Sequence, residues 1–417
     1  MLMNLWGWNM KIGKFAKNNN LTIDTVRYYV ELGLLLPEKV NNQFSFDEKC
    51  QKDLEEIISL KNMRFSISQI QSIFSVRRFT KIINDDELNY YVSFFENKKN
   101  ELLKEKKEID KSIKNIENKI VEIKNNYKEK NVEFGIPVIF IQNFSCPNCN
   151  KQLNLVKGNI ENNQLFNGEF NCECGYKAEV IDGILVTGTA ETSTPKNLEK
   201  DNPGNIFVKK TNMSFANLIY KGMSWIYKRL NQTDLSDKII LEIGTGSGFF
   251  LKKLIDSLDE RSVYIAIDNN LEFLKSTKKY LQAIGKKANI IFIACDFKDI
   301  PLKNDMADIL LDVYGTADDS LDKDFYPIRD TKHLLKKNGV WYGTYIHFND
   351  NSKTLNTINK KAREKYKSDF IKKSFSKNGF NEQEVSFLGK ATKYGESEPF
   401  IVDGDTVYHW GFVCRKL

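Results

Sequence analysis

The feature of this chain that most narrows its possible folds is a glycine-rich turn directly after an apolar run. The run is residues 239–243 (IILEI), and the turn has the pattern Glu242-x-Gly244-x-Gly246-x-Gly248. An unbroken apolar run of this length is typical of a parallel strand buried on both faces. Glycines let the backbone approach a ligand closely, and the helix expected after the turn offers it free N–H groups. The stretch therefore predicts a nucleotide-binding α/β domain.

Two further apolar runs end in an acidic residue, as expected for neighbouring strands of one parallel sheet. Residues 262–268 (SVYIAID) end at Asp268, about 20 residues after the turn, where an acid can accept both hydroxyls of a ribose. Residues 290–297 (IIFIACDF) bring Asp296 and Phe297 to the next strand end. A nicotinamide-binding turn reads GxGxxG, whereas this turn reads ExGxGxG. Acids at three successive strand ends fit S-adenosylmethionine better.

The stretch from about 237 to 345 resembles class I S-adenosylmethionine-dependent methyltransferases. The resemblance implies S-adenosylmethionine as the cofactor, and it assigns a role to each residue of the motif. Glu242 orders the turn that Gly248 completes, Gly244 and Gly246 line the methionine part, Asp268 binds the ribose, Asp296 binds the adenine amino group, and Phe297 covers the ring or bonds to it through its backbone. The alternative is a doubly wound fold without a cofactor.

The residues that would meet the methyl acceptor are less well defined. Methyl transfer is an in-line displacement at the sulfonium, so the protein mainly has to align a nucleophile with it. The expected fourth strand ends in LDVYG (311–315), which lacks the NPPY-type motif of adenine or glutamine methyltransferases and the Pro-Cys pair of cytosine C5 chemistry. Asp312 and Tyr314 are the best acceptor-side candidates, with His347 as a candidate base. For each alone, an exposed Asp or a core aromatic residue is the plainer interpretation.

The N-terminal part predicts a helix-turn-helix with a small wing. Thr22 can cap the second helix, and Gly33 suits its C-terminal end. Residues 39–46 (KVNNQFSF) predict a two-stranded wing, and Asp47 opens a further helix. Residues 65–74 (FSISQIQSIF) begin another helix.

These motifs resemble the N-terminal domain of MerR-family transcription regulators over about 70 residues. The resemblance rests on the stretches TVRYY (25–29), ELGLL (31–35), the wing with its two phenylalanines, and RFSISQI (64–70). It implies binding to double-stranded DNA, with a candidate contact set of Thr25, Arg27, Tyr28 and Phe44. The wing reads NQFSF where the family usually has Gly-Tyr-Arg, so one phosphate contact is missing. The alternative is a helical domain that binds no DNA.

Residues 85–130 predict a long charged helix with an apolar seam. From Ile109 to Tyr127 the apolar residues are spaced 4, 3, 4, 3 and 4 apart, which is the a/d pattern of a coiled coil. Lys99 and Lys106 fall on seam positions and weaken its first part. MerR-like regulators dimerise through a helix at this place, so a homodimer is implied. The alternative is a helix that packs within its own chain.

Four of the seven cysteines form two close pairs, Cys146/Cys149 and Cys172/Cys174. Paired cysteines in a cytosolic protein indicate metal rather than disulfides. The CxxC half is a strong zinc signal, whereas the CxC half is one residue short and is expected to be strained. The stretch resembles the zinc ribbons that precede some bacterial methyltransferases, including rRNA guanine methyltransferases. Four thiolates leave no open position, so the predicted role of Zn²⁺ is structural.

The predicted architecture is multidomain α and α/β. It comprises a winged helix-turn-helix at 10–80, a dimerisation helix at 85–130, a zinc ribbon at 136–190 and a Rossmann-like class I methyltransferase domain at 207–417. Residues 187–205 have linker composition.

Composition adds only broad limits. The chain has 417 residues, a net charge of +7 and 41% hydrophobic residues, which suits packed domains and neither requires nor excludes nucleic acid. No apolar run is long enough to span a bilayer, and the first nine residues lack signal-peptide features, so a cytoplasmic location without membrane contact is expected. Met10 is a second plausible start.

Three functions remain open from the sequence. The preferred one is a methyltransferase that acts on a small molecule and regulates transcription through its head. The second is a regulator whose methyltransferase-like domain only senses S-adenosylmethionine or a related molecule. The third is a methyltransferase acting on rRNA or another nucleic acid, which the missing base-modification motifs disfavour.

Overall fold

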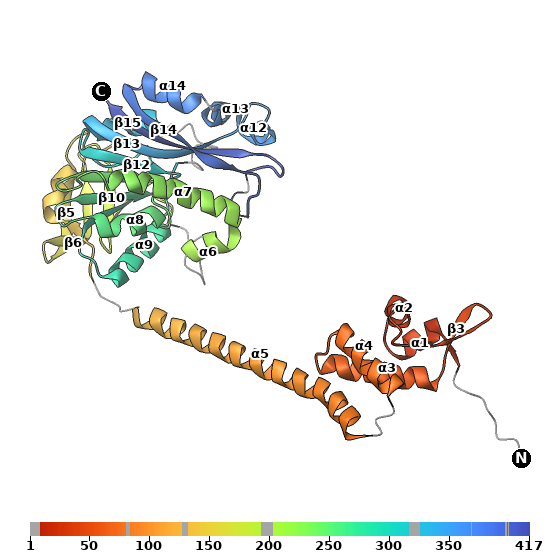
Figure 1. Ribbon diagram of the computed structural model, residues 1–417. Coiled ribbons are helices and arrows are strands. Elements are labelled where there is room, and N and C mark those ends of the chain that lie inside the picture. Colours follow the sequence, from red (N-terminus) through yellow and green to blue (C-terminus); the bar gives the residue numbers. More distant parts are fainter. Residues whose placement is uncertain are drawn as a thin grey trace, which may run out of the picture. The chain divides into compact units, whose positions relative to one another are not determined.

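A computed structural model describes residues 9–80, 84–126, 132–192, 203–316 and 326–417, apart from positions 368, 397 and 399. The chain divides into two compact units, residues 1–127 and 128–417 (Figure 1). Each unit is described by itself. No helix in the described ranges is both long and apolar enough to cross a bilayer.

The first unit has the predicted helix-turn-helix and wing. Its elements are β1 (Met10–Lys11), α1 (Ile12–Asn18), α2 (Ile23–Glu31), β2 (Glu38–Val40), β3 (Gln43–Phe46), α3 (Glu48–Asn62), α4 (Ile67–Phe79) and α5 (Asp85–Asn126). β3 pairs with both β1 and β2 in a small antiparallel sheet. The turn between β2 and β3 is made by Asn41 and Asn42, both with positive φ. This is the twist that a two-residue hairpin needs, and asparagine tolerates it well.

Local capping fixes where the helices of this unit begin. The Thr22 hydroxyl accepts a hydrogen bond from the Thr25 N–H, and the Asp47 carboxylate accepts one from the Cys50 N–H. Ser66 and Gln69 form a reciprocal capping box at the start of α4. The predicted caps at Thr22 and Asp47 are therefore confirmed.

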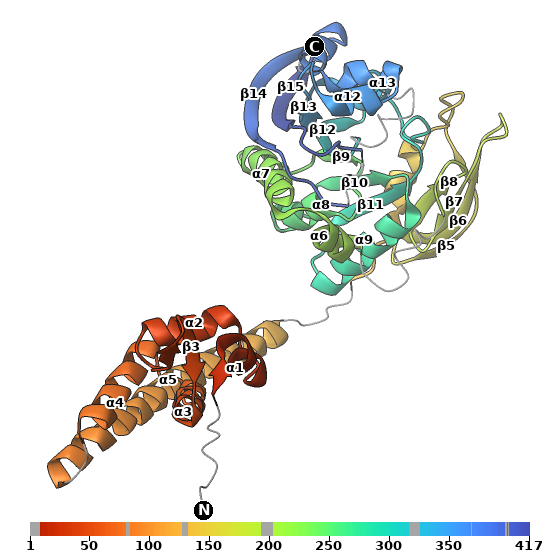
Figure 2. The same cartoon turned by 90° about the vertical axis from the view of Figure 1, so that its right-hand side faces the viewer.

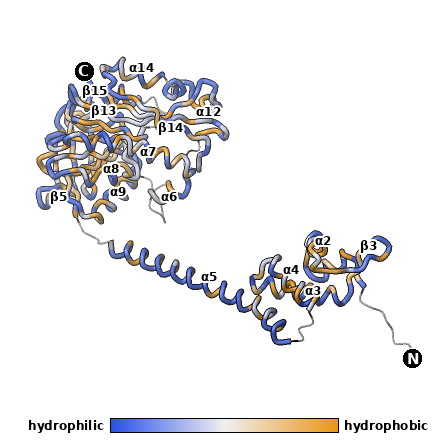
Figure 3. Tube along the Cα trace, viewed as in Figure 1, coloured by the Kyte–Doolittle hydropathy of each residue, from blue (hydrophilic) through white to orange (hydrophobic). Residues whose placement is uncertain are grey.

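The long helix α5 packs against the head only through its first part. The Phe95 ring lies 5.5 Å from the Phe65 ring, and the Lys98 ammonium lies over that same Phe65 ring. Beyond these contacts the trace is mostly hydrophilic (Figure 3). The seam isoleucines are 46–61% exposed, and they are Ile109, Ile113, Ile116, Ile120 and Ile123. Tyr127, the last predicted seam position, lies outside the described residues.

The second unit is built on one mixed sheet of twelve strands. The strand order is β14-β15-β13-β12-β9-β10-β11-β8-β7-β6-β4, with β5 also paired to β6 (Figure 2). The strands are β4 (Ile136–Pro137), β5 (Asn154–Glu161), β6 (Gln164–Asn171), β7 (Lys177–Ile181), β8 (Ile184–Thr187), β9 (Ile239–Ile243), β10 (Val263–Asp268), β11 (Asn289–Ala294), β12 (Ala307–Val313), β13 (Leu335–His347), β14 (Phe380–Ala391) and β15 (Val407–Lys416). The six central strands, β13, β12, β9, β10, β11 and β8 in spatial order, are all parallel to one another.

The chain reverses its direction of winding at β9. It passes from β9 to β10 and β11 on one side, and then returns to place β12 and β13 on the other side. In open α/β sheets a ligand binds at such a switch point, outside the carboxyl ends of the strands. The predicted glycine-rich turn lies at this position.

Helices cover both faces of the sheet. On one face α7 (Met213–Leu230), α8 (Phe249–Leu254) and α9 (Leu271–Ile284) bury apolar side chains against the strands. On the other face lie α11 (Pro327–Thr331), α14 (Phe370–Lys377) and the short 3₁₀ helix η1 (Val138–Asn143). The remaining short elements are α6 (Pro203–Lys210), α12 (Lys353–Thr357), α13 (Lys360–Arg363), η2 (Ile255–Ser257), η3 (Lys332–Leu334) and η4 (Glu364–Tyr366).

The cysteine-bearing region continues this sheet. β8 pairs in parallel with β11, with Ile184 opposite Phe292, and β7, β6 and β4 extend the sheet outward. The predicted ribbon at 136–190 and the predicted domain at 207–417 thus share one sheet within one compact unit. The sequence predicts a linker from 187 onward, but residues 187–192 are docked on the sheet. Glu191 forms a parallel bridge with Asn270.

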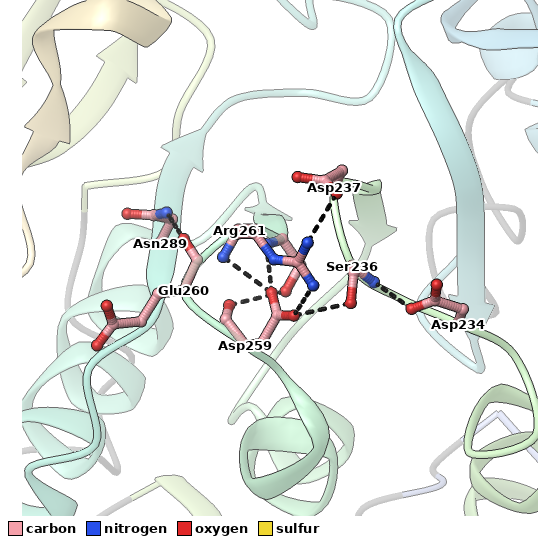
Figure 4. A network of polar contacts seen from close by, with 8 residues as sticks. Asp234, Ser236, Asp237, Asp259, Glu260, Arg261 and Asn289 are labelled. Atoms are coloured by element: carbon pink, nitrogen blue, oxygen red, sulfur yellow. Dashed lines mark hydrogen bonds and ion pairs between the residues drawn. The ribbon is translucent and has the colours of Figure 1, made fainter.

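The amino ends of the parallel strands are joined by a surface polar network (Figure 4). The Asp259 carboxylate accepts hydrogen bonds from the Ser236 hydroxyl at 2.8 Å and from the Arg261 N–H at 2.8 Å, and Arg261 also pairs with Asp237. These bonds hold the Asp259 pKa down at about 2, the Ser236 hydroxyl bond most strongly. The network joins the loops that enter β9 and β10. It lies at the edge of the sheet opposite the carboxyl ends of these strands, where ligand contacts are expected.

Candidate functional site

The glycine-rich turn is shaped by a close approach of two backbones. Gly244 has a φ of +72°, and a Cβ placed on it would lie 2.2 Å from the Gly315 carbonyl oxygen. Gly315 in turn has no room for a side chain, because a Cβ there would lie 2.1 Å from the Ile243 carbonyl oxygen. Glycine is required at both positions, where the ends of β9 and β12 meet.

Gly246 differs from Gly244 because it faces open space. Its φ is +52°, and nothing lies within 4 Å of the position that a Cβ would occupy. Its N–H donates a 2.7 Å hydrogen bond to Asp268 Oδ2, while Asp268 Oδ1 accepts one from the Asn270 N–H at 2.9 Å. The acid at the end of β10 therefore sits directly beside the turn, as its predicted role with a ribose requires.

The next acid, Asp296, lies in a turn just after β11. The carboxylate accepts a hydrogen bond from the Lys298 N–H at 2.9 Å, and the Asp296 N–H donates to Thr189 Oγ1 at 3.2 Å. Phe297 is buried, with its ring in the core on the ribbon side of the sheet. Thr189 belongs to the segment for which the sequence predicts a linker, so sequence reasoning missed this neighbour.

Glu242 is buried on the face of the sheet covered by α7, α8 and α9. Its side chain is only 2% exposed, and its Oε2 atom has no hydrogen-bond partner among the described residues. Burial raises its pKa to about 7, and the nearby Tyr264 and Thr245 hydroxyls only partly oppose that rise. Glu242 therefore lies buried just before the turn, in an environment that disfavours its charge.

The described part of α6 lies beside the start of α8. The ring of Phe207 in α6 is 5.3 Å from the ring of Phe249, the first residue of α8 after the glycine-rich turn. Gly395 packs against the end of the same helix, since a Cβ there would lie 1.9 Å from the Lys210 carbonyl oxygen. The glycine-rich turn is thus flanked by a helix that lies between β8 and β9 in sequence.

Asp312, the first acceptor-side candidate, is fully buried at the end of β12. Its two carboxylate oxygens accept hydrogen bonds from the Thr316 hydroxyl at 2.8 Å and the Thr316 N–H at 3.2 Å. Burial raises its pKa to about 6, which the Thr316 bonds partly oppose. The structure therefore gives Asp312 a part in holding the backbone after β12.

Tyr314 and His347, the other two candidates, are placed with different neighbours. Tyr314 has a φ of +60°, and its hydroxyl lies 3.2 Å from His409 Nδ1 and close to Gly222 of α7. His347 stacks on Tyr408 at 5.2 Å, and burial lowers its pKa to about 4. His409 lies on β15, far from Tyr314 in the sequence, and no sequence signal indicates this contact.

A small pocket opens at the carboxyl ends of β12 and β13. Two polar atoms of its lining, Thr344 Oγ1 and Tyr326 Oη, are buried without a hydrogen-bond partner in the described ranges. Thr316, which bonds to Asp312, also lines it. The rest of the lining is mainly apolar and aromatic: Pro327, Ile328, Tyr345, Ile346, Lys365, Tyr366, Phe370 and Ile371. A mainly apolar and aromatic lining with a few unpaired polar groups is typical of sites for small organic molecules.

The four paired cysteines converge as predicted. Their Sγ atoms all lie within 4.8 Å of one another, and the Cys146–Cys174 and Cys149–Cys172 pairs are each 3.4 Å apart. A tetrahedral zinc with bonds of about 2.3 Å needs sulfur atoms about 3.8 Å apart, so the four thiolates fit this ion. In the CxC half the turn after Cys174 is made by Gly175, which has a φ of +93°.

The predicted DNA contacts lie on α2 and the wing. The Arg27 side chain is 60% exposed and pairs only with Asp24 at 3.3 Å, and Tyr28 is 48% exposed. Thr25 bonds to Thr22 in the cap of α2. Phe44 is half-buried on the wing, with the Lys39 ammonium 5.3 Å from the centre of its ring.

Comparison with known protein families identifies two domains. Residues 10–76 match the family described as MerR HTH family regulatory protein, and residues 234–388 match a methyltransferase domain family. The prediction of a MerR-type head joined to a methyltransferase domain is confirmed at the level of these two domains.

Individual relatives cover only parts of the chain. A ZntR homolog from Haemophilus influenzae, described as an HTH-type transcriptional regulator, is 34% identical over 74 residues, which cover 17% of this chain. The match spans about half (55%) of that relative's length.

Solved structures resemble the second unit weakly. A SAM-dependent methyltransferase from Aquifex aeolicus is 18% identical, with a TM-score of 0.35, over 52% of this chain and 100% of its own. A geranyl diphosphate methyltransferase is 12% identical, with a TM-score of 0.37, over 47% of this chain and 76% of its own. At such values neither likeness supports a functional assignment, which rests on the family matches.

The residues around the turn fit S-adenosylmethionine. Gly246 leaves open space beside the Asp268 carboxylate, and the neighbouring Asn269 Oδ1 is buried without a hydrogen-bond partner among the residues described. An unpaired buried polar atom is unfavourable, and a polar ligand at this edge would pair it.

We expect Gly246→Ala to fold but to bind cofactor less well. The new methyl group meets no protein atom, so the cost is about 1 kcal/mol from the positive φ. It enters the space assigned to the methionine part, and affinity for S-adenosylhomocysteine should fall about tenfold, or about 1.4 kcal/mol, by calorimetry. Gly404→Ala, at a φ of +82° in open space elsewhere, is the matched control. Equal affinity in both variants would contradict the assignment.

We expect Glu242→Gln to change how the stability of the second unit depends on pH. The folded-state pKa of about 7 exceeds the ordinary 4.5, so the unfolded chain releases this proton first and wild-type stability falls as pH rises from 4.5 to 7. Relative to wild type, the variant should gain about 3 kcal/mol between pH 4 and pH 8. Urea unfolding followed by tryptophan fluorescence measures this. The exposed Glu260→Gln should leave the pH dependence unaltered.

Proposed function

We propose that this chain, which joins a MerR-type DNA-binding head to a class I methyltransferase domain, methylates a small molecule and regulates transcription. The observation that carries the first part is the pocket at the carboxyl ends of β12 and β13, adjacent to the switch point of the sheet. Its apolar and aromatic lining suits an apolar or aromatic small molecule better than a nucleic acid strand. With duplex DNA as its partner, the proposed location of the chain is the cytoplasm.

In this proposal the cofactor lies along the carboxyl edge of β9, β10 and β11. The backbone at Gly244 and Gly246 lines its methionine part, Asp268 binds the ribose and Asp296 binds the adenine. When bound, S-adenosylmethionine supplies the electrophilic methyl group. The Thr344 and Tyr326 hydroxyls, which lack partners in the described structure, would hydrogen-bond the acceptor and orient it.

The protein contributes mainly alignment to this reaction. Asp312 is held by Thr316, and Tyr314 is half-buried against Gly222 and His409. His347 is packed against Tyr408. An acceptor with its own nucleophilic atom needs little more than to be held in line with the methyl group. Such positioning removes a large part of the activation barrier to transfer.

The same placement of the acceptor-side candidates favours a second function, that of a sensor. If no side chain has to move a proton, the domain could bind S-adenosylmethionine and alter DNA binding without transferring the methyl group. The two functions share the cofactor site and differ in whether an acceptor is consumed.

The head binds duplex DNA in this proposal through α2 and the wing. The exposed Arg27 and Tyr28 would meet phosphates from α2, with Thr25 and Phe44 at the flanks. A palindromic site implies a homodimer, and the exposed isoleucine seam of α5 is the surface proposed to form it.

The function is tested with methyl-labelled S-adenosylmethionine, the full-length protein and the small-molecule fraction of a cell extract. We expect label in a small molecule with wild type and much less with Asp268→Asn, because the ribose contact is weakened. Binding of S-adenosylhomocysteine without any labelled product would favour the sensor. Label in added RNA or DNA instead would rule out a small-molecule acceptor.

We expect Arg27→Ala to weaken binding to duplexes of any sequence. An arginine that contacts a phosphate contributes to the binding free energy whatever the base sequence. The slope of log affinity against log salt concentration should therefore become shallower by about 1 for each phosphate that is no longer neutralised. Fluorescence anisotropy over a salt series measures the slope, and Arg27→Lys, which keeps the charge, should retain most of it. An unaltered slope in Arg27→Ala would remove this residue from the interface.

A further inference from the structure

We propose that the four-cysteine cluster controls the adenine end of the cofactor site through Asp299, so that binding of zinc and of S-adenosylmethionine reinforce each other. The inference rests on the proposed cofactor site and goes beyond it by naming a positioning residue and a metal linkage. It is carried by the contacts around the turn at 296–299, which follows β11.

The first half of the cluster is attached to the chain just after this turn. The Ser145 N–H, next to Cys146, donates to the Pro301 carbonyl at 3.1 Å, and the Lys303 N–H donates to the Asn143 carbonyl at 3.0 Å. An antiparallel bridge between Phe144 and Leu302 lies between these two bonds. The backbone of the CxxC knuckle and the exit of the turn thus form one short paired segment.

The second half of the cluster reaches the turn directly. Tyr176 follows Cys174 by two residues, and its carbonyl accepts a hydrogen bond from the Cys172 N–H at 2.9 Å. Its hydroxyl donates to Asp299 Oδ2 at 3.3 Å. The position of this hydroxyl therefore depends on the fold of the CxC knuckle.

A third connection runs through the crossing segment, residues 187–192, which follows β8. Thr189 Oγ1 donates to the same Asp299 Oδ2 at 2.8 Å and accepts from the Asp296 N–H at 3.2 Å. Two residues further on, the Glu191 N–H donates to the Asn269 carbonyl, beside the ribose acid Asp268. The crossing segment therefore bonds to Asp296 and to Asn269, the residue next to Asp268.

Asp299 is the point where these connections meet. One carboxylate oxygen receives a hydroxyl from the knuckle and a hydroxyl from the crossing segment, while the Asp299 N–H donates to the Asp296 carbonyl at 2.8 Å. Zinc binding to thiolates is coupled to folding of the segment that carries them. Loss of the metal would release Tyr176 and the paired segment at 301–303. Asp299 would then lose its support, and the turn that positions Asp296 would shift.

Because linkage between two ligands is reciprocal, each should stabilise the other by the same factor. We expect the zinc-loaded full chain to bind S-adenosylhomocysteine at least tenfold more tightly than the chain stripped with a chelator. In the reverse direction, saturating S-adenosylhomocysteine should slow the transfer of zinc to a chromogenic chelator several-fold. This second readout requires no catalysis.

The variant Asp299→Ala tests the route with the metal in place. We expect it to retain one zinc per chain, to bind S-adenosylhomocysteine about as weakly as the stripped wild type, and to lose the effect of that ligand on zinc release. Asp299→Asn, which keeps one acceptor oxygen, should recover part of both effects. Lys151→Ala removes only an exposed ion pair with Glu173 on the knuckle surface and should behave as wild type.

The outcomes separate this inference from the proposed function. If the zinc-loaded wild type binds no S-adenosylhomocysteine, the cofactor site itself is wrong. If it binds equally well with and without zinc, or if Asp299→Ala keeps wild-type affinity and ligand-dependent zinc release, the linkage is overturned. Should the stripped chain unfold, the Asp299 variants still decide the question because they keep the metal.

Discussion

The second unit depends on the contact of two glycines at the centre of its sheet. β9 and β12 are neighbours at the switch point, and the chain leaves both strands in the same small space. Only backbones without side chains can cross there, as the distances around Gly244 and Gly315 show. This contact directs the turn that carries Gly246 toward Asp268. Without it the N-terminus of α8, Asp268 and the pocket beside Thr316 would not share one edge of the sheet.

Much of this arrangement could be predicted from local sequence signals. Thr22 and Asp47 cap their helices, and the glycine-rich turn and the acid at Asp268 meet as the motif predicts. Helix caps and tight turns depend on residues a few positions apart, so a short stretch of sequence is enough to predict them. The four cysteines also converge, because each pair lies in a tight turn that is fixed by its own local hydrogen bonds.

What could not be predicted depends on contacts between distant parts of the chain. The crossing segment has the composition of a linker, and only its pairing with residues around 270 and 296 gives it a fixed position. His409 and Tyr314 lie 95 residues apart in the sequence, and no periodic pattern of residues predicts that they pair. The same holds for Asp299, one of many acids in the sequence until Tyr176 and Thr189 are placed beside it.

The parallel pairing of β8 with β11 has a consequence for how this protein can be divided. A fragment that began at residue 207 would keep every motif of the methyltransferase family yet lack the neighbour that covers the outer backbone of β11. Its residues Phe292, Ile293 and Ala294 would then present an open, apolar strand edge, which invites association with other chains. The smallest piece that keeps this edge closed therefore includes the ribbon.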